Sequence, residues 1–264
     1  MLALAVLVVG ATLAIVAQAG DELVLPGVTR ATFDNGLRVT VAEYHELPLV
    51  EFYLIVGAGA AQDPTGKDGL AALTAGTLTR GAGRLSAEAL ARAIESLGGR
   101  LGASAGTDGT IVTGEFLAKD FGAGLDLLRQ VVLDPGFARD EVRRARDEQV
   151  AGIVASLEDT SAVAEKCFAA FLYGSHPYGR PLDGRRATVP GLGRGDVRDF
   201  YDRWYRPNNT ILVLVGDVEA HTAVVGLREA FGAWRPRADA LPERLPPPAR
   251  VAGRRLLLVD KPDA

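Results

Sequence analysis

The chain has 264 residues, 48% of them apolar and 23% charged, with a formal net charge of −4 at pH 7. This length is enough for one large domain or two small ones with a core that folds without disulfide cross-links. Lysine and arginine form no long run and are spread among acidic residues, which argues against a nucleic-acid-binding protein. The one cysteine, Cys167, excludes an intrachain disulfide. Its apolar neighbours predict a buried structural thiol.

Residues 1–19 form an apolar run without a charged side chain. The run ends in Ala17-Gln18-Ala19, and small residues at these positions fit a signal-peptidase site. It is also long enough to span a bilayer. We therefore expect a cleaved signal peptide, with a retained membrane anchor as the alternative. Both place the rest of the chain outside the cytoplasm, in a bacterial periplasm or secreted.

Six segments have the composition and alternation of β-strands. Residues 29–33 and 37–42 flank Asp34-Asn35-Gly36. An Asn-Gly pair between alternating segments predicts a β-hairpin, because both residues tolerate positive φ. The other strands are expected at 50–56, 101–105, 110–117 and 209–215.

Seven segments are expected to be helical. The helix at 87–97 has the clearest signals, because Ser86 is a favoured N-cap residue, apolar residues recur on one face and Gly98-Gly99 follows. Pairs of strands followed by helices indicate the α+β class, with a mostly antiparallel sheet and helices packed mainly on one face. The expected helices span residues 70–78, 87–97, 121–133, 138–157, 161–172, 196–205 and 220–234.

A stretch rich in proline and arginine at 239–250 is interpreted as a linker. It follows the main domain, which we expect to span residues 27–238. After the linker, the apolar run at 255–259 predicts a new strand. We therefore expect residues 251–264 to begin a second domain that is truncated.

Five short motifs occur in order along the chain. The longest is a helix that ends in Tyr205-Arg-Pro-Asn-Asn209 and leads into an apolar strand ending in Gly216-Asp217. Together the motifs resemble the insulinase/pitrilysin family, the inverted zincins, and especially its processing-peptidase-like bacterial branch. The other four are Asp34-Asn-Gly-Leu-Arg-Val39, Gly57-Ala-Gly59 with Asp63-Pro-Thr-Gly66 and Gly69-Leu-Ala71, Ile94-Glu-Ser-Leu-Gly-Gly99, and His176-Pro-Tyr-Gly-Arg-Pro181 with Gly184.

The resemblance covers about residues 28–235 and implies the N-terminal half of such a peptidase. It divides the main domain into a peptidase-like part at about 28–185 and a part carrying the Tyr-x-Pro-Asn-Asn motif at about 186–238. The family's strand beside the site often contains Leu-Asn-Ala, whereas this chain has Leu101-Gly-Ala103. A substrate-contacting asparagine is therefore also expected to be absent.

The resemblance also predicts where a zinc site would lie. In the family, Gly-Leu-Ala-His-x-x-Glu-His on a helix and a distal glutamate bind zinc, and the first glutamate activates the attacking water. Here the two histidine positions are Ala72 and Gly76, the general-base position is Ala75, and the distal glutamate position is Gly152. None of these side chains has a donor atom. We therefore expect no catalytic residue, no bound metal and no other cofactor.

Three isolated histidines could be invoked for another site. His45, His176 and His221 have no histidine or cysteine close to them in sequence. His45 and His221 are expected on the surface, and His176 is explained by its motif. A metal site built on any of them is disfavoured.

These observations lead to three functional hypotheses. The favoured one is a non-catalytic homologue of an insulinase-type zinc peptidase. It would pair with an active paralogue in a peptide-degrading or processing chamber and bind extended peptides along a strand edge. It would contact no nucleic acid, and no membrane apart from an N-terminal anchor. The alternatives are an active zinc metalloendopeptidase with an unrecognised site and an envelope scaffold protein.

Overall fold

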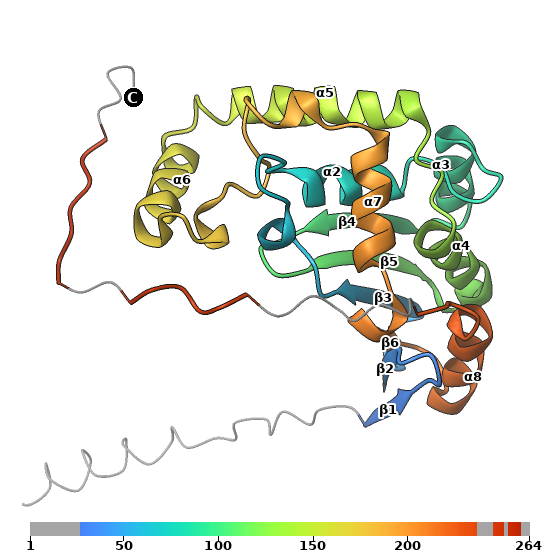
Figure 1. Cartoon of the computed structure of the whole chain (residues 1–264). Helices are drawn as coiled ribbons and strands as arrows, with labels where there is room; N and C mark the ends of the chain where they lie inside the picture. Colours follow the sequence, from blue (N-terminus) through green and yellow to red (C-terminus); the bar gives the residue numbers. More distant parts are fainter. Residues whose placement is uncertain (1–26, 237–244, 251–252, 260–264) are drawn as a thin grey trace, which may run out of the picture.

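The computed structural model describes residues 27–236, 245–250 and 253–259. Its centre is a six-stranded sheet in the order β1-β2-β6-β3-β5-β4 (Figure 1). Four neighbouring pairs are antiparallel, and only β2 and β6 run parallel. The mostly antiparallel sheet predicted from the sequence is confirmed. The strands are β1 Val28–Thr32, β2 Arg38–Glu43, β3 Leu49–Val56, β4 Arg100–Ala105, β5 Thr110–Leu117 and β6 Thr210–Gly216.

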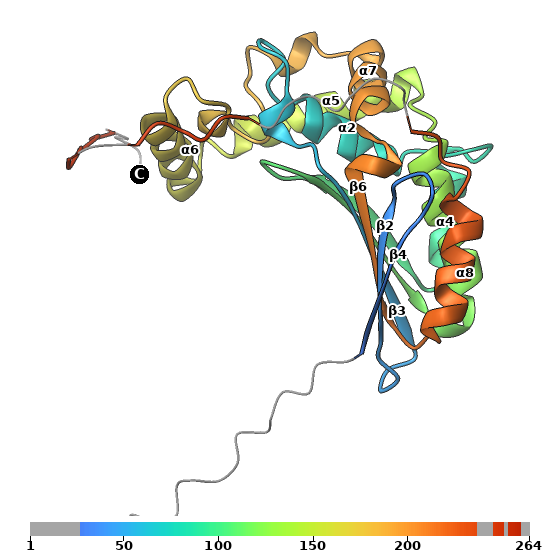
Figure 2. The same ribbon diagram turned by 60° about the horizontal axis from the view of Figure 1, so that its bottom comes forward.

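The helices cover one face of the sheet and leave the other open (Figure 2). Helices α4 and α8 lie along the sheet, whereas α2, α5 and α7 gather beyond one end of it. Helix α6 extends away from the rest. The α+β class is therefore confirmed. The helices are α2 Leu70–Leu78, α3 Ala87–Ser96, α4 Phe121–Leu133, α5 Arg139–Ala155, α6 Thr160–Tyr173, α7 Arg194–Trp204 and α8 Ala220–Phe231.

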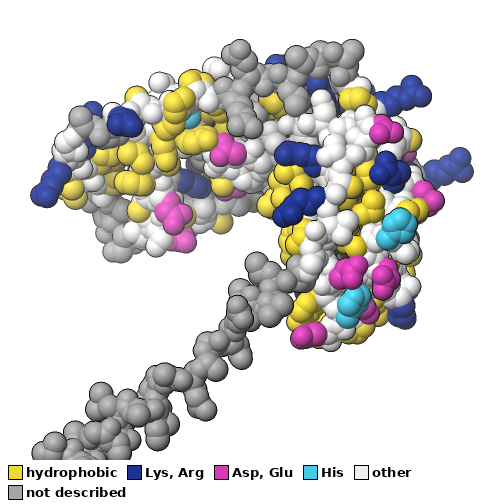
Figure 3. Space-filling model, turned by 90° about the horizontal axis from the view of Figure 1, so that it is seen from below, with side chains coloured by type: hydrophobic (Ala, Val, Ile, Leu, Met, Phe, Trp, Pro, Cys, Tyr) yellow, Lys and Arg dark blue, Asp and Glu magenta, His cyan; other side chains and the backbone are white. Residues whose placement is uncertain are grey.

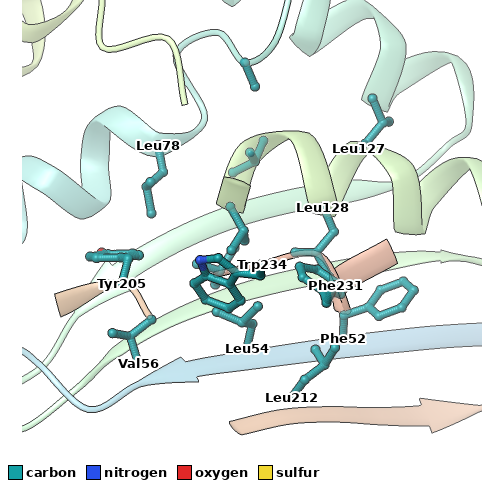
Figure 4. Packing of buried hydrophobic residues seen from close by; sticks show 14 of the residues in the cluster. Phe52, Leu54, Val56, Leu78, Leu127, Leu128, Tyr205, Leu212, Phe231 and Trp234 are labelled. Atoms are coloured by element: carbon teal, nitrogen blue, oxygen red, sulfur yellow. The ribbon is translucent and has the colours of Figure 1, made fainter. Parts of the chain in front are cut away.

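The core lies between the covered face of the sheet and the helices. Alternation along β3 explains it, because every second residue of a strand points to the same face. Phe52, Leu54 and Val56 are fully buried there, whereas Tyr53 between them is exposed. Figure 4 shows Phe52 and Leu54 beneath Phe231 and Trp234, and Val56 beneath Tyr205.

The turn between β1 and β2 is tied to the end of α8. Gly36 has a φ of 87°, which the predicted Asn-Gly turn requires. The Asn35 amide donates hydrogen bonds to the carbonyl oxygens of Phe231 at 2.8 Å and Trp234 at 3.0 Å. These carbonyls lie at the C-terminus of α8, where backbone acceptors have no partner within the helix. The hairpin therefore orders the last helix as well as itself.

Several sequence predictions need correction. Residues 255–259 were expected as a strand, but they have no strand pairing in the part of the chain that the structure describes. Leu256 and Leu258 there are 92% and 89% exposed, so the apolar pattern has no sheet to join. Helix α8 ends at Phe231 rather than at residue 234. Cys167 is half-buried on α6, not buried, because α6 stands apart from the core.

Some predictions concern residues that lie outside the described ones. These are the signal peptide or anchor at 1–19, the end of the main domain at 237–238, the first part of the linker at 239–244, and residues 251–252 and 260–264 of the expected second domain. Within residues 27–236, 245–250 and 253–259, no helix is long and apolar enough to cross a bilayer.

Candidate functional site

Helix α2 is the centre of the candidate site, because it carries three of the four positions that the resemblance assigns to zinc chemistry. It contacts β4, α5 and α7. Leu70, Leu73 and Leu78 are buried in the core, which fixes the helix by its apolar side chains. The orientation of α2 is therefore set by the packing of its apolar side chains.

A buried carboxylate holds the start of α2. The side chain of Asp63 is only 5% exposed. Its two oxygens accept hydrogen bonds from the backbone N–H of Gly69 at 2.7 Å and of Ala71 at 2.8 Å. These N–H groups belong to the first turn of the helix, where they have no partner within it. Burial raises the pKa of Asp63 to about 6, although these bonds favour the charged form.

A glycine brings α2 against the segment that follows α6. Gly69 has a φ of 96°, and a Cβ atom there would lie 2.7 Å from the carbonyl oxygen of Asp183. The Gln149 amide on α5 donates to the carbonyl oxygens of Gly69 at 3.0 Å and Asp183 at 2.8 Å. Three segments far apart in the sequence thus meet at this end of α2.

The four positions named in the sequence analysis differ in their surroundings. On α2, Ala72 is half-buried, Ala75 is 1% exposed, and Gly76 is exposed. On α5, Gly152 is also exposed. A Cβ atom at Gly76 or Gly152 would meet nothing within 4 Å. Larger side chains would fit at both glycines, so packing does not require glycine at either.

An ion pair joins α2 to α5 near these positions. The Arg80 guanidinium, just after α2, binds the two carboxylate oxygens of Glu148 at 3.3 and 2.5 Å. It also donates to the Gly76 carbonyl oxygen at 3.0 Å. The hydrogen bond from Arg80 to Glu148 lowers the pKa of Glu148. Arg80 lies four residues after Gly76, and Glu148 lies four residues before Gly152. The ion pair therefore links α2 and α5 about one helical turn away from these two family ligand positions.

Strand β4 offers an open edge beside α2. Among the described strands it pairs only with β5, and it is the last strand in the sheet. The Gly106 N–H donates to the Gly109 carbonyl oxygen at 2.8 Å in the turn that follows. Antiparallel alternation then directs the backbone N–H and C=O of Leu101 and Ala103 away from β5. Both residues are half-buried, so the edge is partly accessible.

The three histidines are dispersed over the structure. His45 is exposed, and its Nδ1 lies 2.7 Å from a carboxylate oxygen of Asp217. Hydrogen bonds to Asp217 and Glu43 raise the pKa of His45. Figure 3 shows histidine side chains close to acidic ones on the face of the molecule seen from below. His221 is exposed on α8, as predicted. Among the described residues, no group of three or more histidine, cysteine or acidic side chains is arranged to hold a metal ion.

Comparison with known proteins identifies the family. The family model described as Insulinase (Peptidase family M16) matches residues 38–185, and the one described as Peptidase M16 inactive domain matches residues 191–263. The first match alone covers more than half of the chain. The protein therefore belongs to peptidase family M16, as its five motifs implied.

Individual relatives agree with this assignment. An uncharacterized zinc protease of Mycobacterium leprae is 29% identical over 240 residues, which cover 90% of this chain and 54% of the relative. One of Mycobacterium tuberculosis is 31% identical over 206 residues, covering 77% of this chain and 46% of the relative. The chain thus spans about half the length of these curated relatives.

Solved structures share the fold. A peptidase M16 inactive domain from Pseudomonas fluorescens matches with a TM-score of 0.78 and 28% identity, covering 84% of this chain and 54% of that one. The periplasmic protease PqqL from Escherichia coli matches with a TM-score of 0.77 and 20% identity, covering 84% of this chain and 25% of that one. The second similarity concerns the fold alone.

Sequence reasoning missed two parts of the site. Asp63 was noted only as part of a turn motif. It lies six residues before Gly69 and eight before Ala71, which is too far along the chain for a local capping pattern to indicate its two hydrogen bonds. The Arg80–Glu148 pair joins residues 68 positions apart and leaves no local pattern. An aspartate in an Asp-Pro-x-Gly turn just before an apolar helix is the one local signal that could have indicated the capping role.

Proposed function

We propose that this protein is a non-catalytic member of peptidase family M16. The observation that carries the proposal is the set of side chains at Ala72, Ala75, Gly76 and Gly152. None of them can donate a ligand to zinc or remove a proton from water. The residues present therefore do not fit the metal that the family resemblance implies, and no hydrolytic step can be assigned to them.

The well-anchored framework around these positions supports a retained shape. Asp63 caps α2, Gln149 bridges α5 to two loops, and Arg80 joins α2 to α5. These contacts are all made between groups of the chain itself. An ordered framework without side chains for catalysis favours a role in binding or assembly.

We assign peptide binding to the open edge of β4. An extended peptide can add to such an edge through main-chain hydrogen bonds, with little dependence on its sequence. An active M16 paralogue would supply the zinc and complete the chamber, for peptide degradation or processing. One alternative is an active zinc metalloendopeptidase. It would need a cluster of metal-binding side chains, and the described residues contain no such cluster. The other alternative is an envelope scaffold protein.

Two further aspects belong to this proposal. Export to the periplasm or secretion rests on the apolar segment 1–19 and its Ala17-Gln18-Ala19 ending. The similarity to a periplasmic protease fold is compatible with it. A main domain at 27–238, a linker at 239–250 and the start of a second domain at 251–264 remain the proposed organisation.

A mixing experiment tests the partner role. The purified chain should not cleave a fluorogenic peptide, and adding a paralogue with an intact His-x-x-Glu-His motif should produce or raise cleavage. Ala103→Pro removes an N–H that points away from β5, so it should weaken this activation while leaving the sheet paired. Ala103→Val keeps the N–H and is the matched control. No rise on mixing would count against pairing.

Equal activation by both variants would count against binding along β4. Cleavage by this chain alone, persisting after removal of contaminating peptidases, would instead support the active-enzyme alternative. The same cleavage assay therefore separates a failure of pairing, a failure of peptide binding along β4, and activity of this chain alone.

A further inference from the structure

A proline-rich segment lies against the loop that follows α6. Residues 245–250 read Leu-Pro-Pro-Pro-Ala-Arg. Three consecutive prolines fix φ near −65° and force the preceding residue to be extended, so this segment favours the polyproline II conformation. In Figures 1 and 2 it passes on the side of the molecule where α6 and the loop after it lie.

The segment is hydrogen-bonded to His176, whose ring forms an aromatic cluster with those of Tyr173 and Tyr178. The rings of His176 and Tyr178 are 4.8 Å apart with an interplanar angle of 87°, and those of Tyr173 and Tyr178 are 5.6 Å apart at 85°. A hydrogen bond to Asp108 raises the pKa of Tyr178. Since Asp108 lies in the turn between β4 and β5, the cluster is fixed to the sheet as well as to α6.

A directional hydrogen bond joins the cluster to the segment. The Tyr178 N–H donates to His176 Nδ1 at 3.2 Å. That nitrogen must therefore carry a lone pair, which leaves the proton of the neutral ring on Nε2. Nε2 lies 2.9 Å from the Pro246 carbonyl oxygen and can donate to it. Local backbone geometry thus selects the tautomer that recognises the segment.

The burial of the segment has the period of a polyproline II helix. Leu245 and Pro248 are half-buried, whereas Pro246 and Pro247 between them are exposed. This helix has three residues per turn, so positions i and i+3 lie on the same side. One side therefore faces the protein and the other faces solvent. Aromatic surfaces with a hydrogen-bond donor are a general means of binding such segments.

We propose that the aromatic cluster is an intramolecular docking site for the proline-rich segment 245–250. The segment is thus a fixed strap rather than a free tether. It directs the chain that follows toward the α6 side of the molecule, including the exposed apolar residues Leu256 to Val259. This inference does not depend on the loss of zinc ligands.

Distance measurement between two spin labels tests the docking in the full chain. Labels are attached at Ala164→Cys on α6 and Ala249→Cys on the segment, both exposed, in a Cys167→Ser background. Docking predicts one narrow distance distribution. Adding His176→Asn should broaden it, because asparagine can still cap the Tyr178 N–H but is too short to reach Pro246. Loss of one hydrogen bond should lower the ratio of docked to free segment about 2- to 12-fold.

The matched control is His221→Asn, the same substitution at an exposed histidine on α8. It should leave the distribution narrow. The double variant Pro246→Gly, Pro247→Gly tests the same docking in a second way. It removes the backbone restriction that favours polyproline II and leaves the folded domain unchanged, so it should also broaden the distance distribution. A broad distribution in the parent chain would overturn the proposal. So would unchanged distributions in both His176→Asn and the double-glycine variant, or equal broadening in the control.

Discussion

Replacing Asp63 with alanine should destabilise the protein, and the loss should be larger at pH 4 than at pH 7. The substitution leaves the N–H groups of Gly69 and Ala71 buried without an acceptor. Each such group costs about 1–3 kcal/mol. This part of the loss is present at every pH.

The pH dependence comes from the raised pKa. Burial moves the pKa of Asp63 from 3.8 to about 6. A group whose folded-state pKa is raised stabilises the fold fully below its unfolded pKa and loses that contribution as the pH rises through the folded pKa. The complete difference corresponds to about 3 kcal/mol, of which about 2 kcal/mol falls between pH 4 and pH 7. We expect Asp63→Ala to cost about 4 kcal/mol at pH 4 and about 2 kcal/mol at pH 7.

Urea unfolding of the wild type and the variant at both pH values measures this difference. The control is Asp199→Ala, which removes an exposed carboxylate on α7 and should change the free energy of unfolding by less than about 0.5 kcal/mol. A cost that grows from pH 4 to pH 7 would refute the reasoning. Asp63 would then be a carboxylate with a lowered pKa, in which the hydrogen bonds outweigh burial.

Two further substitutions probe how α2 is held. Gly69→Ala should lower the free energy of unfolding by about 2–4 kcal/mol, because it combines a positive φ with a clash against Asp183. Gly66→Ala also has a positive φ but meets open space, so it should cost about 1 kcal/mol. Similar losses for the two variants in urea unfolding would contradict the close approach of Gly69 to Asp183. Arg80→Met should cost less than about 1 kcal/mol at neutral pH and low salt, because the pair is partly exposed. Since Arg80 lowers the pKa of Glu148, that cost should shrink as the pH falls below 5 or as salt is added, and a cost independent of both would argue against the pair.

Local signals allowed most elements to be predicted from the sequence. The Asn35-Gly36 turn fixed the first hairpin, and Ser86 accepts the Ala89 N–H at 3.2 Å as an N-cap. What could not be predicted was pairing between distant segments. Strand β6 inserts between β2 and β3 and runs parallel to β2, and its apolar sequence is compatible with many neighbours.

The candidate site divides in the same way. The family resemblance assigned Ala72, Ala75, Gly76 and Gly152 to the zinc-site positions, and these residues lie on the contacting helices α2 and α5. The contacts that hold these helices join residues far apart in the chain and leave no periodic trace. His176 was noted as a motif residue, but its acceptor at Pro246 lies 70 residues away and could be found only in three dimensions.

Zinc binding by the purified chain tests the central claim most directly. After chelation and dialysis against trace zinc, we expect well below one zinc per chain by elemental mass spectrometry. A variant with Ala72→His, Gly76→His and Gly152→Glu should gain one zinc, whereas the same variant with Gly152→Gln should bind it more weakly. Tight binding of one zinc per wild-type chain would contradict the account.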